Sequence, residues 1–403
     1  MMEVKSLLSE RTQFMKASDI RELLKWVTED VISLGGGMPD PSTFPKELAD
    51  IARDVIATKG SSALQYGKTE GVDELKDELI RFMAKDGIKA DRDEIIITTG
   101  SQEALDLVGR ITIDAGNVVI TERPTYLAAL QAFKAYRPNI VGIDMDSEGM
   151  VMDKLEEAVK KSISDGRRIK FIYVIPTCQN PTGISMSIDR RKHLMELASK
   201  YDLLIVEDNP YSYFLFDGIY VPPLKSMDYE NRVVYMSTFS KIIAPGIRVG
   251  WVVGNRELIR WIAMAKQAVD LHTSTLSQYI ALEALRRGII ERNLPRIREV
   301  YKVKRDAMLD ALAKYMPEQV TWTRPIGGMF VWASVNGVRT EDMLPVAVSK
   351  YKVAYVPGKS FYPAEDVHTS MRLNFTYPSV DMIYEGIRRL SNAIRDELKR
   401  SGN

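Results

Sequence analysis

Short apolar runs without polar alternation are the feature of this sequence that most limits its fold. They include Ile95–Thr99, Val118–Thr121, Phe171–Ile175 and Leu203–Glu207, and helix-like stretches separate them. Strands of this composition are buried on both faces, because a strand with one wetted face alternates apolar and polar residues. The pattern therefore predicts an α/β fold with a mostly parallel central sheet flanked by helices.

The alternation of strands and helices ends after Asn255. A long helical tract is expected to reach Tyr315, with breaks near Gly288 and Pro295. Beyond it, short strands (Met329–Ala333, Met371–Phe375) mix with helices (Thr340–Lys350, Val380–Lys399). Since 403 residues exceed one average domain, we predict two. Residues 46–290 form a large α/β domain, and residues 1–45 with 291–403 form a smaller, discontinuous α+β domain.

Charge and composition exclude several classes of partner. The 55 basic and 54 acidic residues nearly cancel, which argues against a nucleic-acid or membrane partner. The sequence has no apolar run long enough for a membrane span and no signal-peptide pattern at Met1 to Lys16. A single cysteine, Cys178, fits a reducing cytoplasm. The three scattered histidines predict no metal site.

The segment Ser237–Arg248 predicts the chemistry. It contains one lysine, Lys241, after the strand-like run Arg232–Met236. Burial lowers the pKa of a lysine, which makes its amine nucleophilic toward an aldehyde. The hydroxyls of Thr238 and Ser240, with Arg248, supply donors for a phosphate. Pyridoxal 5′-phosphate requires both a Schiff-base lysine and a phosphate anchor.

Two further positions suit the ends of that cofactor. Ser101 and Gln102 begin a helix after Gly100, where free backbone N–H groups and the helix dipole favour a phosphate. Asp208 follows the apolar run ending at Glu207, so its carboxylate can keep the pyridine nitrogen protonated. The simpler interpretations are an ordinary helix cap at Ser101 and a strand-ending acid at Asp208.

Three more side chains can surround the ring. Tyr211 lies three residues after Asp208, and Asn180 lies in a loop after another strand; both can hydrogen-bond the ring oxygen. Tyr126 opens a helix and can stack on the ring face, although an aromatic there is more often part of a core.

With these motifs in order along nearly the whole chain, the sequence resembles the fold-type I pyridoxal phosphate-dependent aminotransferases of the aspartate aminotransferase superfamily. The group of α-aminoadipate and kynurenine aminotransferases is the most similar. The resemblance rests on Gly35–Pro39, Tyr66–Gly67, Gly100–Leu105, Pro124–Tyr126, Gln179–Gly183, Glu207–Tyr211, Ser240–Lys241 and Arg372.

The resemblance implies a role for each residue. Lys241 is the Schiff-base lysine and proton carrier, and Asp208, Tyr211 and Asn180 contact the ring, with Tyr126 stacked on it. Ser101, Gln102, Thr238, Ser240 and Arg248 hold the phosphate. Arg372 binds the substrate carboxylate, with Asn180 and the glycine turn at Gly36 also contacting substrate. Thr238 stands where serine is usual, but the hydroxyl is kept.

Two residues carry further implications. Tyr66 matches a tyrosine that reaches the phosphate of the neighbouring subunit, which implies a homodimer with shared active sites. Arg21, in a short helix expected over Ala17–Trp26, matches an arginine that meets the substrate side chain. The alternative for Arg21 is a solvated charge on the helix surface.

The expected activity is therefore a transferase reaction: ping-pong transamination from an α-amino acid, such as 2-aminoadipate or an aromatic donor, to a 2-oxo acid, with 2-oxoglutarate as the expected acceptor. The motifs serve the cofactor without selecting the bond that breaks, so a decarboxylase, β-lyase or synthase is the alternative. A ligand-sensing regulator on this fold is disfavoured, because fewer than 50 residues precede the α/β region and they contain no helix-turn-helix pattern.

Overall fold

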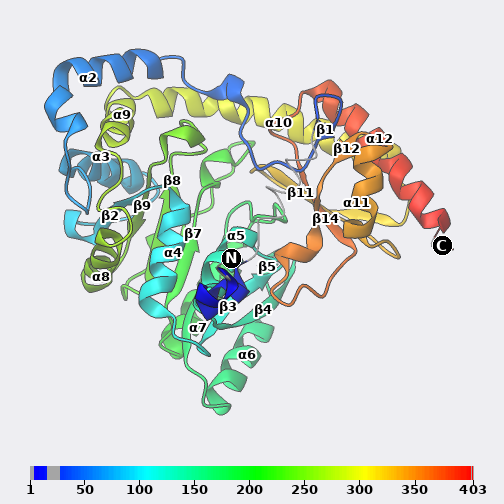
Figure 1. The fold of residues 1–403 in the computed structure, drawn as a ribbon, viewed down its shortest axis with the longest axis horizontal. Helices are drawn as coiled ribbons and strands as arrows, with labels where there is room; N and C mark the ends of the chain where they lie inside the picture. Colours follow the sequence, from blue (N-terminus) through cyan, green and yellow to red (C-terminus); the bar gives the residue numbers. More distant parts are fainter. Residues whose placement is uncertain (1–3, 16–27, 401, 403) are drawn as a thin grey trace.

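The computed structural model describes residues 4–15, 28–400 and 402. Its largest element is an eight-stranded sheet with the order β2-β9-β8-β7-β6-β3-β4-β5 (Figure 1). The strands are β2 (Ile95–Thr98), β3 (Val118–Arg123), β4 (Asn139–Asp146), β5 (Gly149–Met150), β6 (Ile169–Val174), β7 (Ile205–Asp208), β8 (Val233–Thr238) and β9 (Gly250–Val253). The four pairings from β4 to β8 are parallel, and the three that involve β9 or β5 are antiparallel. The α/β class is confirmed, with a parallel centre and antiparallel edges.

Helices cover both faces of this sheet. Val118 and Ile120 pack in one core cluster with Leu155 of α6 (Met152–Ser164) and with α7 (Ile188–Lys200). Val119, between them, packs in the other cluster with Phe133 of α5 (Leu127–Lys134) and with α4 (Ser101–Thr112). Successive residues of one strand point to opposite faces, so both faces of the strand are buried. This explains why the strands show no polar alternation.

The C-terminal third carries separate sheets. Strands β10 (Val320–Trp322), β11 (Phe330–Val335), β14 (Ser370–Asn374) and β13 (Val356–Pro357) form an antiparallel sheet in that order. The short strand β1 (Ile32–Ser33) pairs in parallel with β12 (Val353–Ala354), and α11 (Thr340–Ser349) and α12 (Val380–Arg400) pack beside them. The N-terminal segment thus joins the C-terminal third, as the two-domain prediction requires, although the domain boundaries remain a prediction.

The helical tract after Asn255 forms α8 (Arg256–Gln267), α9 (Thr275–Arg286) and α10 (Ile289–Tyr315). The expected break at Gly288 is present, with φ at 61°. The expected break at Pro295 is wrong, because α10 continues through it. Proline removes one backbone donor from a helix, and the buried residues Ile290, Leu294 and Ile297 stabilise the helix on either side. In Figure 1, α10 runs from α9 to α12 and connects the two regions.

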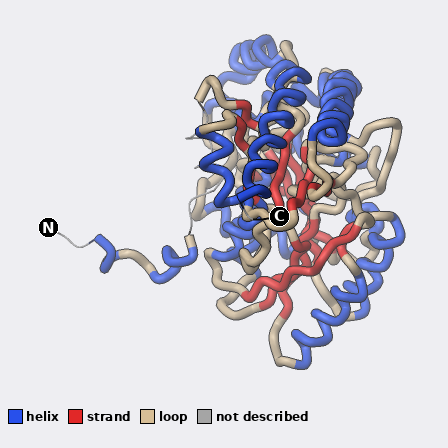
Figure 2. The backbone as a smooth tube through the Cα atoms, turned by 90° about the vertical axis from the view of Figure 1, so that its right-hand side faces the viewer, coloured by secondary structure: helices blue, strands red, loops and turns tan. Residues whose placement is uncertain are grey.

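Two further helices precede the large sheet in the sequence. They are α2 (Leu48–Leu64) and α3 (Asp73–Ala84), and both pack on α9. Residues 4–14 form two 3-10 turns that lie outside the body of the molecule in Figure 2, and Glu10 contacts Arg137 at 3.4 Å. Among the described residues, no helix combines the length and the apolar character that a membrane crossing requires.

Candidate active site

A cavity of about 730 Å³ lies at the carboxyl ends of the parallel strands. Twelve of the fourteen predicted site residues line it: Gly36, Ser101, Gln102, Tyr126, Asn180, Asp208, Tyr211, Thr238, Ser240, Lys241, Arg248 and Arg372. They come from both regions of the chain, and Arg372 belongs to β14. Ligands of open α/β sheets bind at this edge, so the cavity is the candidate active site.

Lys241 follows β8 and points into the cavity. Its Nζ donates a hydrogen bond to the carbonyl oxygen of Gly37 at 2.9 Å. Burial, and then the positive charges of Arg372 and Arg248, lower the pKa of Lys241 from 10.5 to about 8. About a tenth of the amine is therefore uncharged at pH 7, far more than for an ordinary lysine, and the uncharged form is the one that attacks a carbonyl.

Asp208 ends β7 and is buried. The hydroxyl of Tyr173, on the neighbouring strand β6, donates to Asp208 Oδ2 at 2.8 Å. Oδ1 is also buried and has no hydrogen-bond partner among the described residues. Burial raises the pKa of Asp208 to about 7, which the bond from Tyr173 partly opposes. The free oxygen therefore lacks a cationic partner. Sequence reasoning missed Tyr173, whose only signal was a phenol within an apolar strand.

Asn180 connects the predicted ring contacts to the predicted carboxylate site. Arg372 Nη1 donates to Asn180 Oδ1 at 2.9 Å, and Asn180 Nδ2 donates to the Tyr211 oxygen at 3.2 Å. Arginine has donors only, so the oxygen of Asn180 must face it and the amide nitrogen faces Tyr211. The Tyr211 oxygen is then an acceptor in this contact, which leaves its proton free for a ligand.

Arg372 is fully buried between two aromatic rings. Its guanidinium carbon lies 4.3 Å from the Phe330 ring centroid and 5.2 Å from that of Phe361. Nη2 donates to the carbonyl of Gly35 at 3.0 Å, and Nε has no partner among the described residues. Burial lowers the pKa of Arg372 to about 10, so the group stays cationic at neutral pH. The rings leave the guanidinium edge available for a planar anion.

A candidate anion site lies where β2 meets α4. Gly100 has φ of 76°, a conformation that other residues rarely adopt, and a Cβ there would lie 2.5 Å from Arg248 Nη2. Arg248 donates to Thr99 O at 3.2 Å and to Ser240 Oγ at 3.3 Å. Thr238 Oγ1 donates to Ser240 Oγ at 2.9 Å. These groups surround the first turn of α4, where free N–H groups favour a phosphate.

The remaining wall of the cavity comes from α5. Tyr126 is the residue before this helix and lines the cavity, and the amide of Gln102 donates to Ala128 O at 3.4 Å. Burial raises the pKa of Tyr126, so the phenol stays neutral. The neutral ring offers a flat face to a ligand.

Two predicted residues are not in the cavity. Tyr66 is 79% exposed and packs edge-on against His272, with ring centroids 5.8 Å apart. It lines a separate surface cavity of about 490 Å³. Arg21 and the helix predicted around it lie outside the described residues. The roles of both residues stay predictions.

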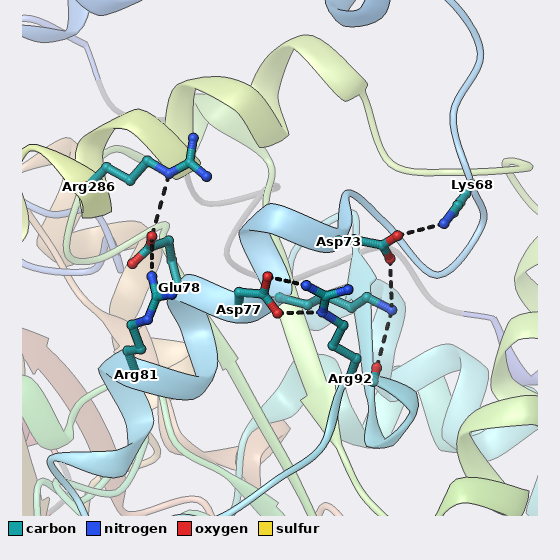
Figure 3. Close-up of polar contacts among 8 residues, drawn as sticks. Lys68, Asp73, Asp77, Glu78, Arg81, Arg92 and Arg286 are labelled. Carbon is teal, nitrogen blue, oxygen red and sulfur yellow. Dashed lines mark hydrogen bonds and ion pairs between the residues drawn. The ribbon is translucent and has the colours of Figure 1, made fainter.

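Ion pairs anchor the segment that carries Tyr66. Lys68, two residues later, pairs with Asp73 at the start of α3 at 2.6 Å (Figure 3). Glu78 on α3 contacts Arg286 on α9 at 3.4 Å (Figure 3). The second contact joins α3 to α9, and the first links the loop that follows Tyr66 to the start of α3.

The donor set of the cavity fits pyridoxal phosphate. An anion site at α4, an amine at Lys241 and a buried carboxylate with an unpartnered oxygen match its phosphate, its aldehyde and its ring nitrogen. A protonated ring nitrogen would supply the cation that Asp208 Oδ1 lacks. By contrast, no cluster of metal-ligating side chains occurs in the described parts of the chain.

Comparison with known proteins gives the same result. The sequence model of the family 'Aminotransferase class I and II' matches residues 29–390 of this chain. Aromatic-amino-acid aminotransferase 1 of Thermococcus litoralis is 49% identical, covering 99% of this chain and 96% of that protein. The 2-aminoadipate transaminase of Thermus thermophilus is 38% identical over 94% of both chains. The crystal structure of a kynurenine aminotransferase from Pyrococcus horikoshii, 48% identical, superposes with a TM-score of 0.95 and covers 98% of each chain.

Proposed function

This chain belongs to the class I and II aminotransferases and is a pyridoxal phosphate-dependent transaminase; from that premise we propose that it accepts aromatic amino acids and 2-aminoadipate as donors and 2-oxoglutarate as acceptor. The observation that carries the proposal is the joint placement of Lys241 and Arg372 in one cavity of about 730 Å³. The volume accommodates long or aromatic side chains beside the cofactor. The aminotransferases that this chain resembles favour transamination over the alternatives of a decarboxylase, β-lyase or synthase.

The residues that would hold the cofactor follow from the contacts above. The phosphate would be bound by Ser101, Gln102, Thr238, Ser240 and Arg248. The ring nitrogen would contact Asp208, and the ring oxygen would contact Tyr211 and Asn180. Tyr126 would cover one face of the ring. When bound, pyridoxal phosphate supplies an aldehyde that condenses with amines and a ring that withdraws electrons from the substrate Cα.

The protein's own groups do the positioning and the proton transfer. Arg372 binds the substrate carboxylate through its guanidinium edge, and Asn180 Oδ1 holds that guanidinium in place. Lys241, with its pKa lowered to about 8, would accept the Cα proton as a general base and would deliver it to the carbon on the other side of the substrate nitrogen. Tyr211 donates its proton toward the ring oxygen.

Substrate breadth is assigned to the apolar side chains that line the cavity. They are Met38, Leu127 and Phe330, and apolar walls suit aromatic side chains. Arg21 is proposed to bind a distal carboxylate, as in 2-aminoadipate.

The proposal includes a homodimer in the cytoplasm. Tyr66 is 79% exposed in the single chain, and a phenol on a loop anchored by ion pairs is suited to reach a neighbouring subunit's phosphate. The single cysteine, Cys178, is a free, buried thiol, in keeping with a reducing compartment. Gel filtration at working concentration tests the dimer, and elution as a monomer would contradict shared active sites.

A donor panel tests the activity. Purified protein is assayed with phenylalanine, tyrosine, kynurenine, 2-aminoadipate and alanine against 2-oxoglutarate, and the formation of glutamate is measured. Lys241→Ala should abolish turnover, and near-normal activity of that variant would refute the mechanism. Arg21→Ala should reduce the rate with 2-aminoadipate while sparing phenylalanine, whereas equal losses would place Arg21 in structure only.

A further inference from the structure

The loop that carries Asn180 is held by a buried carboxylate that the mechanism above does not use. Glu122, near the end of β3, is 1% exposed. Its Oε2 accepts hydrogen bonds from the backbone N–H of Ile175 and from Gln179 Nε2, both at 3.1 Å. One oxygen atom therefore contacts the loop at two points, on either side of the Pro176–Cys178 segment.

The amide of Gln179 has all of its hydrogen-bonding capacity occupied. Nε2 donates to Glu122 and to Pro124 O at 2.8 Å. Oε1 accepts from the backbone N–H of Thr182 at 2.9 Å and from its hydroxyl at 2.7 Å. Two donors and two acceptor positions are the full complement of a side-chain amide. The carbonyl of Pro124 can only accept, so Nε2 must face it, which sets the orientation of the amide and closes the turn from Gln179 to Thr182.

That turn presents Asn180 to the active site. Asn180 is the residue after Gln179, and its amide contacts both Arg372 and Tyr211. A change in the turn would move the acceptor that holds Arg372 and the donor that leaves the Tyr211 proton free. Displacements of about 1 Å are enough to impair such contacts.

A buried cation holds the same loop from its other side. Arg191 donates to Pro176 O at 2.6 Å, to Thr177 Oγ1 at 2.9 Å and to Met186 O at 3.0 Å. Glu122 and Arg191 thus fix the loop through its polar atoms without forming a direct ion pair with each other. Burying two such groups is costly unless their hydrogen bonds are made, so neither group leaves its loop contacts without a penalty.

We propose that Glu122 is a positioning residue of the transaminase: acting through Gln179, it orients Asn180 so that Arg372 binds the substrate carboxylate and Tyr211 contacts the cofactor. The proposal rests on the function proposed above. Glu122 touches neither substrate nor cofactor, so its effect must appear in binding and in the cofactor spectrum.

Comparing Glu122→Val with Glu122→Gln distinguishes a role of Glu122 in positioning the loop from a role in packing alone. Valine removes the acceptor and leaves two buried N–H donors unpaired. Glutamine can place its oxygen at the Oε2 position, because a single oxygen accepts both bonds. Burial raises the pKa of Glu122 to about 8, so the native group is mostly a neutral acid at pH 7, which an amide resembles.

Two readouts do not require turnover. The first is the dissociation constant of 3-phenylpropionate, a carboxylate with no amine to react, on the cofactor-loaded enzyme. Glu122→Val should raise it at least tenfold, as expected for a disturbed hydrogen bond to a charged group. The second is the pKa read from the visible absorbance of the bound cofactor, which should rise by about one unit as hydrogen bonds to the ring oxygen weaken. Glu122→Gln should stay within threefold and about 0.3 units of wild type.

Asp228→Val is the matched control. Asp228 is a buried carboxylate that accepts bonds from the backbone N–H groups of Arg232 and Val233 and from Lys225 Nζ, and it does not line the cavity. Its loss should lower stability without altering either readout. If Glu122→Val leaves both readouts unchanged, or if Asp228→Val alters them equally, the proposal is overturned.

A milder variant covers the case in which Glu122→Val does not fold. Thr182→Val removes the hydroxyl that donates to Gln179 and should shift both readouts in the same direction by a smaller amount; wild-type values would then reject the proposal. A wild-type protein that transfers no amino group would instead refute the proposed function. The binding and spectral results would still decide the role of Glu122.

Discussion

A buried lysine that serves catalysis should destabilise the protein that contains it, and Lys241 allows this to be measured. The perturbation is Lys241→Met in the cofactor-free protein, because methionine fills similar space without a charge. Burial lowers the pKa of Lys241 from 10.5 to about 8. Charging this lysine is therefore less favourable in the folded protein than in the unfolded chain, and the variant should be more stable.

The magnitude follows from the shift of the pKa. A change of 2.5 units, from 10.5 to about 8, corresponds to about 3.4 kcal/mol at roughly 1.36 kcal/mol per unit. Lys241 is partly exposed to water in the cavity, which reduces the cost, so we expect a gain of about 2–3 kcal/mol at pH 7.

The pH dependence has a definite sign. Between pH 8 and 10.5 the unfolded chain binds the lysine proton and the folded protein does not, so wild-type stability rises with pH through this range. Below pH 8 both states are protonated and the full penalty is present. The difference between Lys241→Met and wild type should therefore be largest at pH 7 and nearly vanish by pH 10.5.

The assay is urea unfolding of the cofactor-free proteins at several pH values, followed by circular dichroism. Lys225→Met is the control, because Lys225 is also buried but pairs with Asp228 at 2.8 Å. Removing it leaves a buried carboxylate without its cation, so that variant should be less stable than wild type. If Lys241→Met has the same stability as wild type at pH 7, or if the difference in stability does not change with pH, the pKa of Lys241 is not lowered in the folded protein.

Three further substitutions test other parts of the site. Arg372→Lys keeps the charge but loses the planar fork, so KM for amino-acid donors should rise about 10- to 100-fold, as steady-state kinetics would show; an unchanged KM would place the carboxylate elsewhere. Tyr173→Phe removes the donor to Asp208, which should raise the pKa of that carboxyl further above about 7 and weaken cofactor binding about tenfold in an absorbance titration; wild-type affinity would deny Tyr173 its role. Gly183→Ala should lower the thermal midpoint by several degrees, because Gly183 has φ of 72° and a Cβ would lie 2.4 Å from a backbone oxygen of β11; a normal midpoint would show that the loop can shift.

Local patterns in the sequence were sufficient for the secondary structure that forms the cavity. Apolar runs predicted the strands β2, β3, β6 and β7, and the polar residue after a run predicted Asp208 at the sheet edge. This works because parallel strands bring their carboxyl ends to one edge whatever the intervening helices are. The predicted break at Pro295 is wrong because the packing of α10 outweighs the local preference of proline to end a helix.

The sequence by itself determined the elements and the chemical groups at their ends, because hydrophobic periodicity and turn preferences act over a few residues. Only the tertiary structure decided the contacts between distant parts of the chain: Tyr173 on Asp208, Gly37 on Lys241, and Arg372 on Asn180, which is 192 positions away. Such contacts depend on how the strands are ordered and how the C-terminal sheet packs on the cavity. Neither leaves a periodic signal in the residues that make the contact.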